Sequence, residues 1–266
     1  MDNNISHILD PITPKKFFTE YWNKKHLVIR RNKFKNIFTW NDFDIYMNRF
    51  PRVSNLQVID YDAKHEKWCL DKVRNGKMKL PMLRKADVYD YFKNKNKSIV
   101  IPFAEYENKH LVDLCFEFEK FFGKGTANIY ISPNEKSKSY PAHADSTENF
   151  LFHTEGRVKW IIYEEFAPGK PKNILDEFIL EAGDLLYIPQ FQFHEVKTIG
   201  PRILCSLHFR NKERQSLENF KVTTKQQSDR DKWYNWKPEL YSKQGNINPD
   251  FAYNFRHTGG WKKKYL

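Results

Sequence analysis

The sequence predicts an α+β protein with a mainly β core, because the hydrophobic periodicity changes along the chain. Before Ala127 the apolar residues recur at helical spacing, and from Ala127 onward they alternate with a period of two. The predicted strands follow one another closely, with turn residues between them, at 127–132, 149–154, 157–163, 178–180, 185–188 and 202–209. This succession predicts an antiparallel barrel or sandwich.

The region before these strands is predicted to be helical and mixed, and to pack on the barrel. Thr13 can cap a helix with Pro14 at its first position, and the aromatic residues that follow recur on one helical face. A turn at Asn75-Gly76 indicates a hairpin within residues 51–80, whose structure the pattern otherwise leaves open. A short strand is expected at 27–29, and further helices at 40–50, 87–93 and 111–122.

The composition sets the class of protein. The chain has 266 residues, of which 40% are hydrophobic, so it can bury a sizeable core. It contains no apolar run approaching the roughly 20 residues of a membrane span, and its first residues do not form a secretory signal. The three cysteines, Cys69, Cys115 and Cys205, lack the spacing of a metal site, so a reduced, cytoplasmic protein is expected.

The net charge of the chain is strongly positive, at +12 at pH 7. Such a surplus favours anionic partners, including RNA, ribosomes and acidic peptides, although solvated lysines also keep a protein in solution. A nucleic-acid partner is therefore kept open, without any recognisable nucleic-acid-binding motif in the chain. The basic, aromatic extension at 211–266 is expected to pack on the barrel or to make a homodimer contact. Its run Lys262-Lys263-Lys264 is either a capture site for an anionic substrate or an ordinary solvated tail.

The most informative motif is His143-Ala-Asp145, followed by His194. Two imidazoles and one carboxylate are the ligands of the facial triad that leaves positions on Fe(II) open, although zinc or manganese accepts the same ligands. The first two residues precede a predicted strand, and His194 follows Gly183-Asp-Leu-Leu-Tyr-Ile-Pro189. Ligands at the ends of neighbouring strands predict a metal site in the barrel core, residues 127–210.

These segments, in their order and spacing, resemble the JmjC family of Fe(II)/2-oxoglutarate oxygenases, which includes the ribosomal oxygenases and the asparaginyl hydroxylase that inhibits hypoxia-inducible factor. The resemblance covers roughly residues 12–210. Residues 14–30 look like the family's entry helix and first strand, and 128–133 like the strand before the triad. The resemblance implies a double-stranded β-helix, the cupin or jelly-roll fold, with 1–126 as the helical N-terminal part and a short C-terminal extension.

The resemblance also implies a basic residue that binds the distal carboxylate of 2-oxoglutarate. The family places this residue two positions after the glycine that corresponds to Gly156, where this chain has Val158. Lys159 lies on the opposite face of the strand unless a bulge turns it inward. Arg202 shares a face of the last strand with Ser206, and many related enzymes bind the carboxylate from that strand. We therefore predict Arg202 first and Lys159 second.

Several polar side chains are expected around the co-substrate. Tyr130 and Ser132 share one face of the strand before the triad, together with Asn128, and Asn149 matches a family position that contacts co-substrate or substrate. Each of these residues could equally belong to an ordinary core. His153 and His208 are expected to lie in the core or to support the residues of the site. The loop Phe191-Gln-Phe193 could line the substrate entrance.

The function that this implies is an Fe(II)- and 2-oxoglutarate-dependent dioxygenase that uses O2 to hydroxylate a side chain of a protein or peptide. One alternative is a tRNA-modifying hydroxylase of the same fold. A second is a non-catalytic cupin-like metal-binding protein, which Val158 favours. A third is a metal-dependent isomerase or hydrolase that does not use 2-oxoglutarate.

Overall fold

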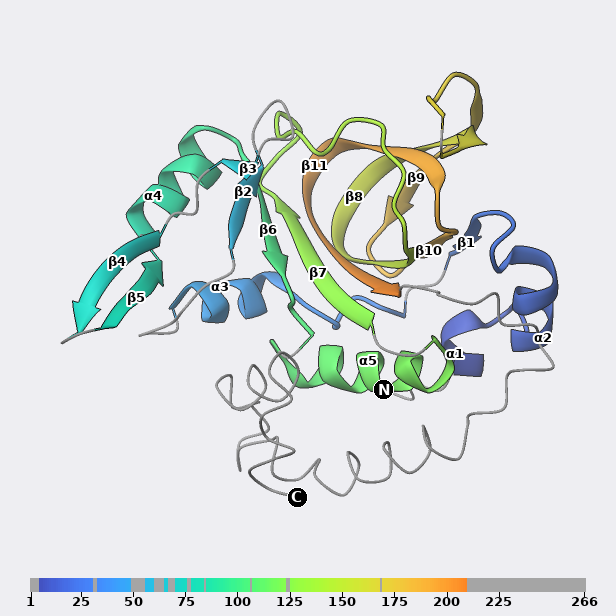
Figure 1. Ribbon diagram of the computed structural model, residues 1–266, viewed down its shortest axis with the longest axis horizontal. Coiled ribbons are helices and arrows are strands. Elements are labelled where there is room, and N and C mark those ends of the chain that lie inside the picture. The colour runs from blue at the N-terminus through green and yellow to red at the C-terminus, as the bar shows by residue number, and fades with distance from the viewer. Residues whose placement is uncertain are drawn as a thin grey trace.

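A curled antiparallel sheet forms the centre of the computed structural model, as Figure 1 shows. The model describes residues 5–30, 33–48, 56–59, 65–66, 70–75, 78–83, 85–105, 107–122, 125–167 and 169–209. Within these residues the sheet has nine strands in the order β1-β10-β8-β11-β7-β6-β2-β3, with β9 paired to β8. The barrel strands are β7 (Gly125–Ser132), β8 (Glu148–Phe166), β9 (Ile174–Glu181), β10 (Leu185–Ile188) and β11 (Gln192–Phe209).

Two barrel strands are longer than the sequence predicts. Segments 149–154 and 157–163 belong to the single strand β8, and the segment 202–209 is the second half of β11. Gly156 allows β8 to continue, since it has a φ of +68° and a Cβ atom there would lie 1.8 Å from the carbonyl oxygen of Pro201. Only glycine accommodates both the left-handed backbone and this close approach of β11.

The N-terminal region adds strands to the same sheet and covers one side of it. β1 (Leu27–Ile29) pairs with β10, and β6 (Ser98–Pro102) pairs with β7. β2 (Gln57–Ile59) and β3 (His65–Glu66) extend the sheet beyond β6, and a separate hairpin consists of β4 (Leu70–Asn75) and β5 (Met78–Leu83). The helices are α1 (Ile5–Leu9), α2 (Pro14–Lys16), α3 (Trp40–Asn48), α4 (Lys85–Tyr89) and α5 (Lys109–Phe122), with π-helical turns at Phe17–Tyr21 and Asp90–Asn94.

The helix starts follow the signals in the sequence. The hydroxyl oxygen of Thr13 accepts a hydrogen bond from the backbone N–H of Lys16, and Pro14 occupies the first turn, as predicted. Asn108 caps α5, since its side-chain oxygen accepts a bond from the backbone N–H of Leu111. The predicted helix at 87–93 corresponds to α4 and the π-helical turn after it.

The main core lies between α5 and the outer face of the barrel. Phe118 of α5 is fully buried, and its ring centroid lies 4.7 Å from that of Phe150 and 5.8 Å from that of Phe209. Burial of this ring stabilises the contact between helix and sheet, so truncation to alanine would cost about 3–5 kcal/mol. Cys115 and Cys205 are both buried, and neither forms a disulfide within the described residues.

A second apolar cluster fills the inside of the barrel. It includes Leu151, Val158 and Trp160 of β8, whereas Phe150 and Phe152 belong to the core under α5. The inward residues are odd-numbered before position 154 and even-numbered after it. This change of phase is a β-bulge, because Leu204 faces His153 and Ile203 faces Glu155, which leaves Thr154 as an extra residue.

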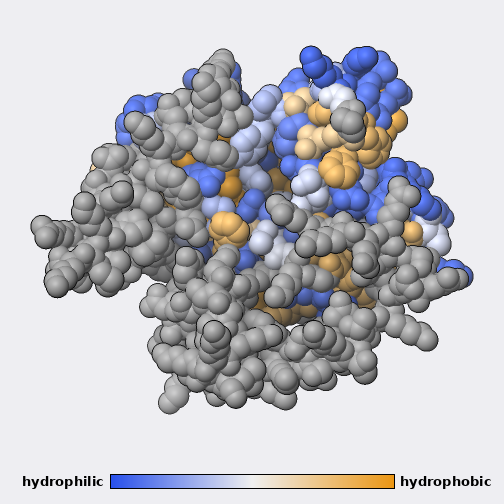
Figure 2. Space-filling view, viewed as in Figure 1, coloured by the Kyte–Doolittle hydropathy of each residue, from blue (hydrophilic) through white to orange (hydrophobic). Residues whose placement is uncertain are grey.

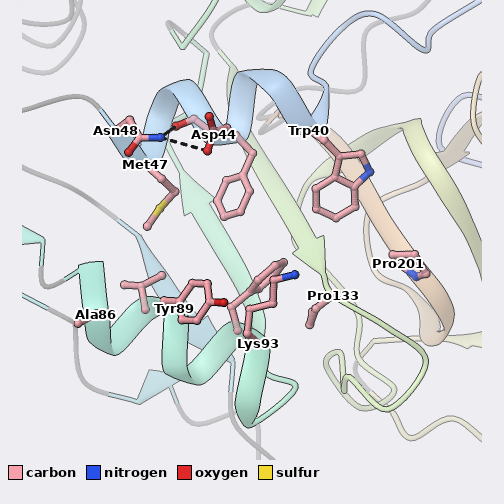
Figure 3. Close-up of a pocket in the computed structure, with 12 residues that line it drawn as sticks. Trp40, Asp44, Met47, Asn48, Ala86, Tyr89, Lys93, Pro133 and Pro201 are labelled. Carbon is pink, nitrogen blue, oxygen red and sulfur yellow. Dashed lines mark hydrogen bonds between the residues drawn. The ribbon is translucent and has the colours of Figure 1, made fainter.

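A groove outside the barrel separates α3 from α4 and the turn after it. It has a volume of about 690 Å³, and Trp40, Met47, Tyr89 and Lys93 face it (Figure 3). Among the described residues, no helix combines the length and apolar character needed to cross a membrane. The predictions for residues 211–266, including Lys262, Lys263 and Lys264, concern a segment outside the described residues, as does Gly76 of the predicted hairpin turn.

Candidate metal centre and co-substrate pocket

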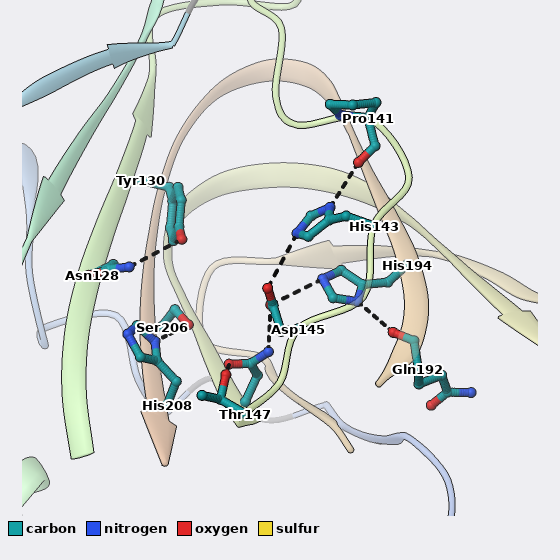
Figure 4. Close-up of polar contacts among 11 residues, drawn as sticks. Asn128, Tyr130, Pro141, His143, Asp145, Thr147, Gln192, His194, Ser206 and His208 are labelled. Carbon is teal, nitrogen blue, oxygen red and sulfur yellow. Dashed lines mark hydrogen bonds and ion pairs between the residues drawn. The ribbon is translucent and has the colours of Figure 1, made fainter. Parts of the chain in front are cut away.

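The predicted ligand residues meet at one end of the barrel. His143 and Asp145 lie in the connection between β7 and β8, and His194 lies near the start of β11. His143 and His194 pair through two backbone hydrogen bonds, of 3.0 and 2.8 Å, which bring the two imidazoles to the same place. Figure 4 shows all three side chains pointing toward one another. One ligand atom from each lies within 4.8 Å of the others.

Hydrogen bonds orient both imidazole rings for metal binding. His143 Nδ1 lies 2.8 Å from the carbonyl oxygen of Pro141, and His194 Nδ1 lies 3.0 Å from that of Gln192. An N–H at each Nδ1 leaves the Nε2 lone pairs free, and these atoms lie 3.9 and 3.6 Å from the Asp145 carboxylate oxygens. Burial, and then the nearby His143, lower the pKa of His194 to about 4, so this ring is neutral at pH 7.

This donor set fits a divalent transition metal such as Fe(II). Two neutral imidazoles and one carboxylate occupy three positions of an octahedron and leave the other three open. The ligands differ in exposure, since the side chain of His194 is 4% exposed whereas those of His143 and Asp145 are 34% and 42% exposed. The open positions can therefore be reached from solvent on the side of His143 and Asp145.

Asn149 orients the carboxylate ligand. Its Nδ2 donates to Asp145 Oδ2 over 2.8 Å, and its Oδ1 accepts from Thr147 Oγ1 over 3.1 Å. Asn149 is 3% exposed, so the amide that contacts Asp145 is itself shielded from water. The sequence predicted a contact with co-substrate or substrate at this position, and the structure places the amide against the metal ligand.

Arg202 is the buried cation of the pocket. It is 1% exposed, its Nε donates to Ser132 Oγ over 3.2 Å, and its Nη2 donates to Ser139 Oγ over 3.3 Å. Within the described part of the chain, Nη1 has no hydrogen-bond partner and no carboxylate forms an ion pair with the guanidinium. Burial lowers the pKa of Arg202 to about 10, which still leaves it charged at pH 7. An unpaired buried cation is costly, and a carboxylate ligand would offset that cost.

Lys159 lies on the outside of the barrel. Its side chain is 36% exposed, and its Nζ lies 2.8 Å from Glu177 Oε2 of β9. The bulge lies at Thr154, before Gly156. After it, the side chains of Val158 and Trp160 point into the barrel and that of Lys159 points out. The structure thus brings Arg202, and not Lys159, into the cavity that contains the triad.

The remaining predicted residues line or adjoin the same cavity. Tyr130 and Ser206 line it, and Ser132 binds Arg202. Tyr130 accepts a hydrogen bond from Asn128 over 3.4 Å, and Ser206 Oγ lies 3.4 Å from Nδ1 of His208. Tyr130 and Ser206 thus provide hydroxyl groups in the cavity that Arg202 and the triad also line.

Sequence reasoning missed several lining residues, among them Ser139, Tyr140 and Trp160. Ser139 and Tyr140 belong to the β7–β8 connection, where no periodic pattern marks an inward side chain. Trp160 carried the correct inward phase but was not assigned to the site. Its Nε1 donates to His153 Nε2 over 2.9 Å, and burial keeps the pKa of His153 well below its ordinary value. His153 is therefore a neutral acceptor that holds Trp160 at the cavity wall.

The cavity itself is small, about 30 Å³, which is about the volume that one water molecule occupies. A dicarboxylate therefore enters only when lining side chains move. Tyr140 is the lining side chain that we expect to move. It lies on a connecting segment, and its ring centroid is 5.7 Å from that of His143. Connecting segments move more readily than barrel strands.

Comparisons with known proteins agree with this geometry. Residues 98–217 match the JmjC domain family. The bifunctional lysine-specific demethylase and histidyl-hydroxylase NO66 of Dictyostelium discoideum is 27% identical over 227 residues, covering 78% of this chain and 42% of that protein. Ribosomal oxygenase 2 of Rattus norvegicus is 26% identical over 217 residues, covering 72% of this chain and 43% of that protein. The chain thus spans less than half of these relatives.

The fold has counterparts among solved structures. The Escherichia coli ribosomal oxygenase YcfD, in complex with cobalt and 2-oxoglutarate, superposes with a TM-score of 0.56 at 18% identity, covering 94% of this chain and 66% of that one. Its complex with cobalt and succinic acid superposes with a TM-score of 0.55 over 88% of this chain and 59% of that one. This similarity confirms the predicted fold class, a double-stranded β-helix with an added helical part.

Proposed function

We propose that this chain, in which residues 98–217 match the JmjC domain family, is an Fe(II)- and 2-oxoglutarate-dependent dioxygenase that hydroxylates a side chain of a protein or peptide. The observation that supports it most is one cavity lined by the triad and by a buried arginine that has no carboxylate partner among the described residues. A metal site alone would also suit a hydrolase or an isomerase. A buried cation aimed at the same cavity adds the requirement for an anionic co-substrate.

Each residue of the site has a separate role that follows from its position. His143, Asp145 and His194 would hold Fe(II), which together with 2-oxoglutarate and O2 supplies the oxidising chemistry for a C–H bond. Arg202 would bind the distal carboxylate, and the hydroxyls of Ser132 and Ser139 fix the plane of its guanidinium. Asn149 keeps the carboxylate of Asp145 in one orientation. Such fixed geometry costs no reorganisation during the reaction.

The substrate class follows from access and from the relatives. The exposed edge at His143 and Asp145 admits a side chain carried by a macromolecule. The relatives are named as ribosomal oxygenases and a histidyl-hydroxylase, which favours a protein substrate. A tRNA substrate, a nucleic-acid partner, a homodimer and a cytoplasmic location stay predictions from the sequence.

Co-substrate turnover tests the proposal directly. The purified full chain is incubated with Fe(II), 2-oxoglutarate and O2, and the succinate formed is measured against the Asp145→Ala variant. We expect succinate only from the wild type. Metal binding without 2-oxoglutarate binding or turnover would instead support a hydrolase, an isomerase or a non-catalytic metal-binding protein, and failure to bind metal would contradict all of these functions.

A further inference from the structure

Two exposed phenylalanines adjoin the metal ligands. Phe166 ends β8, Phe191 precedes β11, and each is 41% exposed. Their backbones are neighbours, since Phe166 faces Gln192 across the strands and the N–H of Ala167 donates to the carbonyl oxygen of Phe191 over 2.9 Å. The N–H of Phe191 donates to the carbonyl oxygen of Asp145 over 2.6 Å, so the backbone of Phe191 lies next to that of a proposed metal ligand. Figure 2 shows apolar side chains gathered over the β8–β9 hairpin.

Phe191 has a backbone that phenylalanine rarely adopts. Its φ is +67°, in the left-handed region where glycine carries no steric penalty. For a bulky side chain this conformation stores strain of about 1 kcal/mol or more. The hydrogen bonds to Asp145 and Ala167 hold the strained residue in place. An aromatic ring that is strained, exposed and rigidly held beside the ligands contributes nothing to the buried core.

We propose that Phe191 and Phe166, here called the aromatic rim, bind an apolar side chain of the polypeptide substrate next to the residue that is oxidised. This inference rests on the proposed function and adds the chemistry by which the substrate is recognised. The rim continues directly from the accessible side of the metal centre, where His143 and Asp145 are exposed. A substrate residue in the cavity therefore places its chain neighbours on the rim.

The charges around the rim favour a polypeptide over a nucleic acid. Aromatic rings also stack on bases, but such sites combine the rings with cations that contact the phosphates. Segment 164–177 carries four carboxylates, Glu164, Glu165, Asp176 and Glu177, against two lysines. Glu165 also stays ionised, because backbone N–H groups led by that of Lys172 hold its pKa below the ordinary value. Glu177 pairs with Lys159, but Glu164 and Glu165 remain beside Phe166 at the end of β8, and these carboxylates disfavour a phosphate backbone while they are compatible with an apolar side chain.

The test selects peptides with the full chain held in a complex that cannot turn over. Immobilised protein, loaded with Fe(II) and 2-oxoglutarate without oxygen, is incubated with a pool of random octapeptides, and the retained peptides are sequenced by mass spectrometry. We expect apolar residues to be enriched about tenfold at one position, the effect of burying one such side chain. Phe191→Gly should reduce this enrichment to background, and Phe166→Ser should reduce it in part.

Phe103→Gly is the matched control. Phe103 is also exposed, at 48%, and also left-handed, with φ of +56°, but it follows β6 and does not line the cavity. Its variant should select the same peptides as the wild type. Cobalt titration of every variant checks that the metal site is intact, so a misfolded variant is recognised.

Three outcomes would overturn the rim. They are retention of peptides without apolar enrichment, no peptide retained by the wild type, or equal selection by wild type and Phe191→Gly. Retention of random RNA in a parallel pool, in place of peptide, would also refute it. The proposed function is judged separately by succinate formation with oxygen. Turnover without apolar selection would contradict only the proposed role of the aromatic rim. Apolar selection without turnover would contradict only the proposed oxygenase activity.

Discussion

Replacing Arg202 with methionine separates two opposite effects of the buried guanidinium. Methionine keeps much of the side-chain volume and removes the charge. In the wild type, burial lowers the pKa of Arg202 to about 10, well below its ordinary value. A lowering of that size disfavours the charged form by about 3 kcal/mol, because burial removes water from the guanidinium and no carboxylate among the described residues pairs with it. Without co-substrate, the variant should therefore be as stable as the wild type or more stable.

With 2-oxoglutarate the order should reverse. A charge-assisted hydrogen bond from arginine to a carboxylate contributes about 1.5–3 kcal/mol, so Arg202→Met should raise the dissociation constant by about one to two orders of magnitude. At a concentration 100 times its dissociation constant, 2-oxoglutarate stabilises the wild type by about 2.7 kcal/mol, and most of this should be lost in the variant.

Calorimetry measures both effects on one protein. Titration of 2-oxoglutarate into the manganese-loaded chain gives the dissociation constant, and thermal unfolding with and without the ligand gives the stabilities. Lys159→Met is the matched control, since its exposed pair with Glu177 contributes at most about 1 kcal/mol. An unchanged dissociation constant in Arg202→Met with a raised one in Lys159→Met would refute the assignment and place the anchor on β8.

Three further predictions concern the triad and its surroundings. His143→Ala and Asp145→Ala should each lose Fe(II) in a metal titration and form no succinate; full activity in both would contradict the ligand assignment. Asn149→Ala should weaken cobalt binding about 10–100-fold and change the cobalt absorption spectrum, because it frees the carboxylate of Asp145, and an unaltered spectrum would count against that role. Burial raises the pKa of Glu148 to about 7, although its hydrogen bond from the Tyr187 hydroxyl, 2.5 Å long, opposes the shift. The native state therefore retains a proton that the unfolded state releases above about pH 4.5, so stability should fall as pH rises to about 7, and Glu148→Gln should flatten this slope in denaturant titrations at pH 5 and 8.

The sequence alone determined the class of fold and identified the candidate metal ligands. The change to a period of two fixed the start of the barrel, since alternating residues can bury one face only as strands. His143-Ala-Asp145 and the distant His194 indicated the metal site because this ligand set is chemically specific. The faces of the last strand were also predictable: Arg202, Leu204 and Ser206 line the cavity, and Ile203 and Cys205 enter the outer core.

Tertiary structure decided which cation faces the pocket and what surrounds it. Local alternation placed Lys159 outward, but a bulge near Gly156 could have turned it inward. Only the pairing of β8 with β11 shows that the extra residue is Thr154. The isolation of Arg202 is equally invisible in sequence, because a missing partner depends on every segment that packs around it. The same holds for Ser139, which irregular backbone brings to the guanidinium, and for Phe191, whose left-handed backbone arises from hydrogen bonds to residues far away in the chain. Periodicity describes regular elements, whereas contacts between irregular segments follow from the packing of the whole barrel.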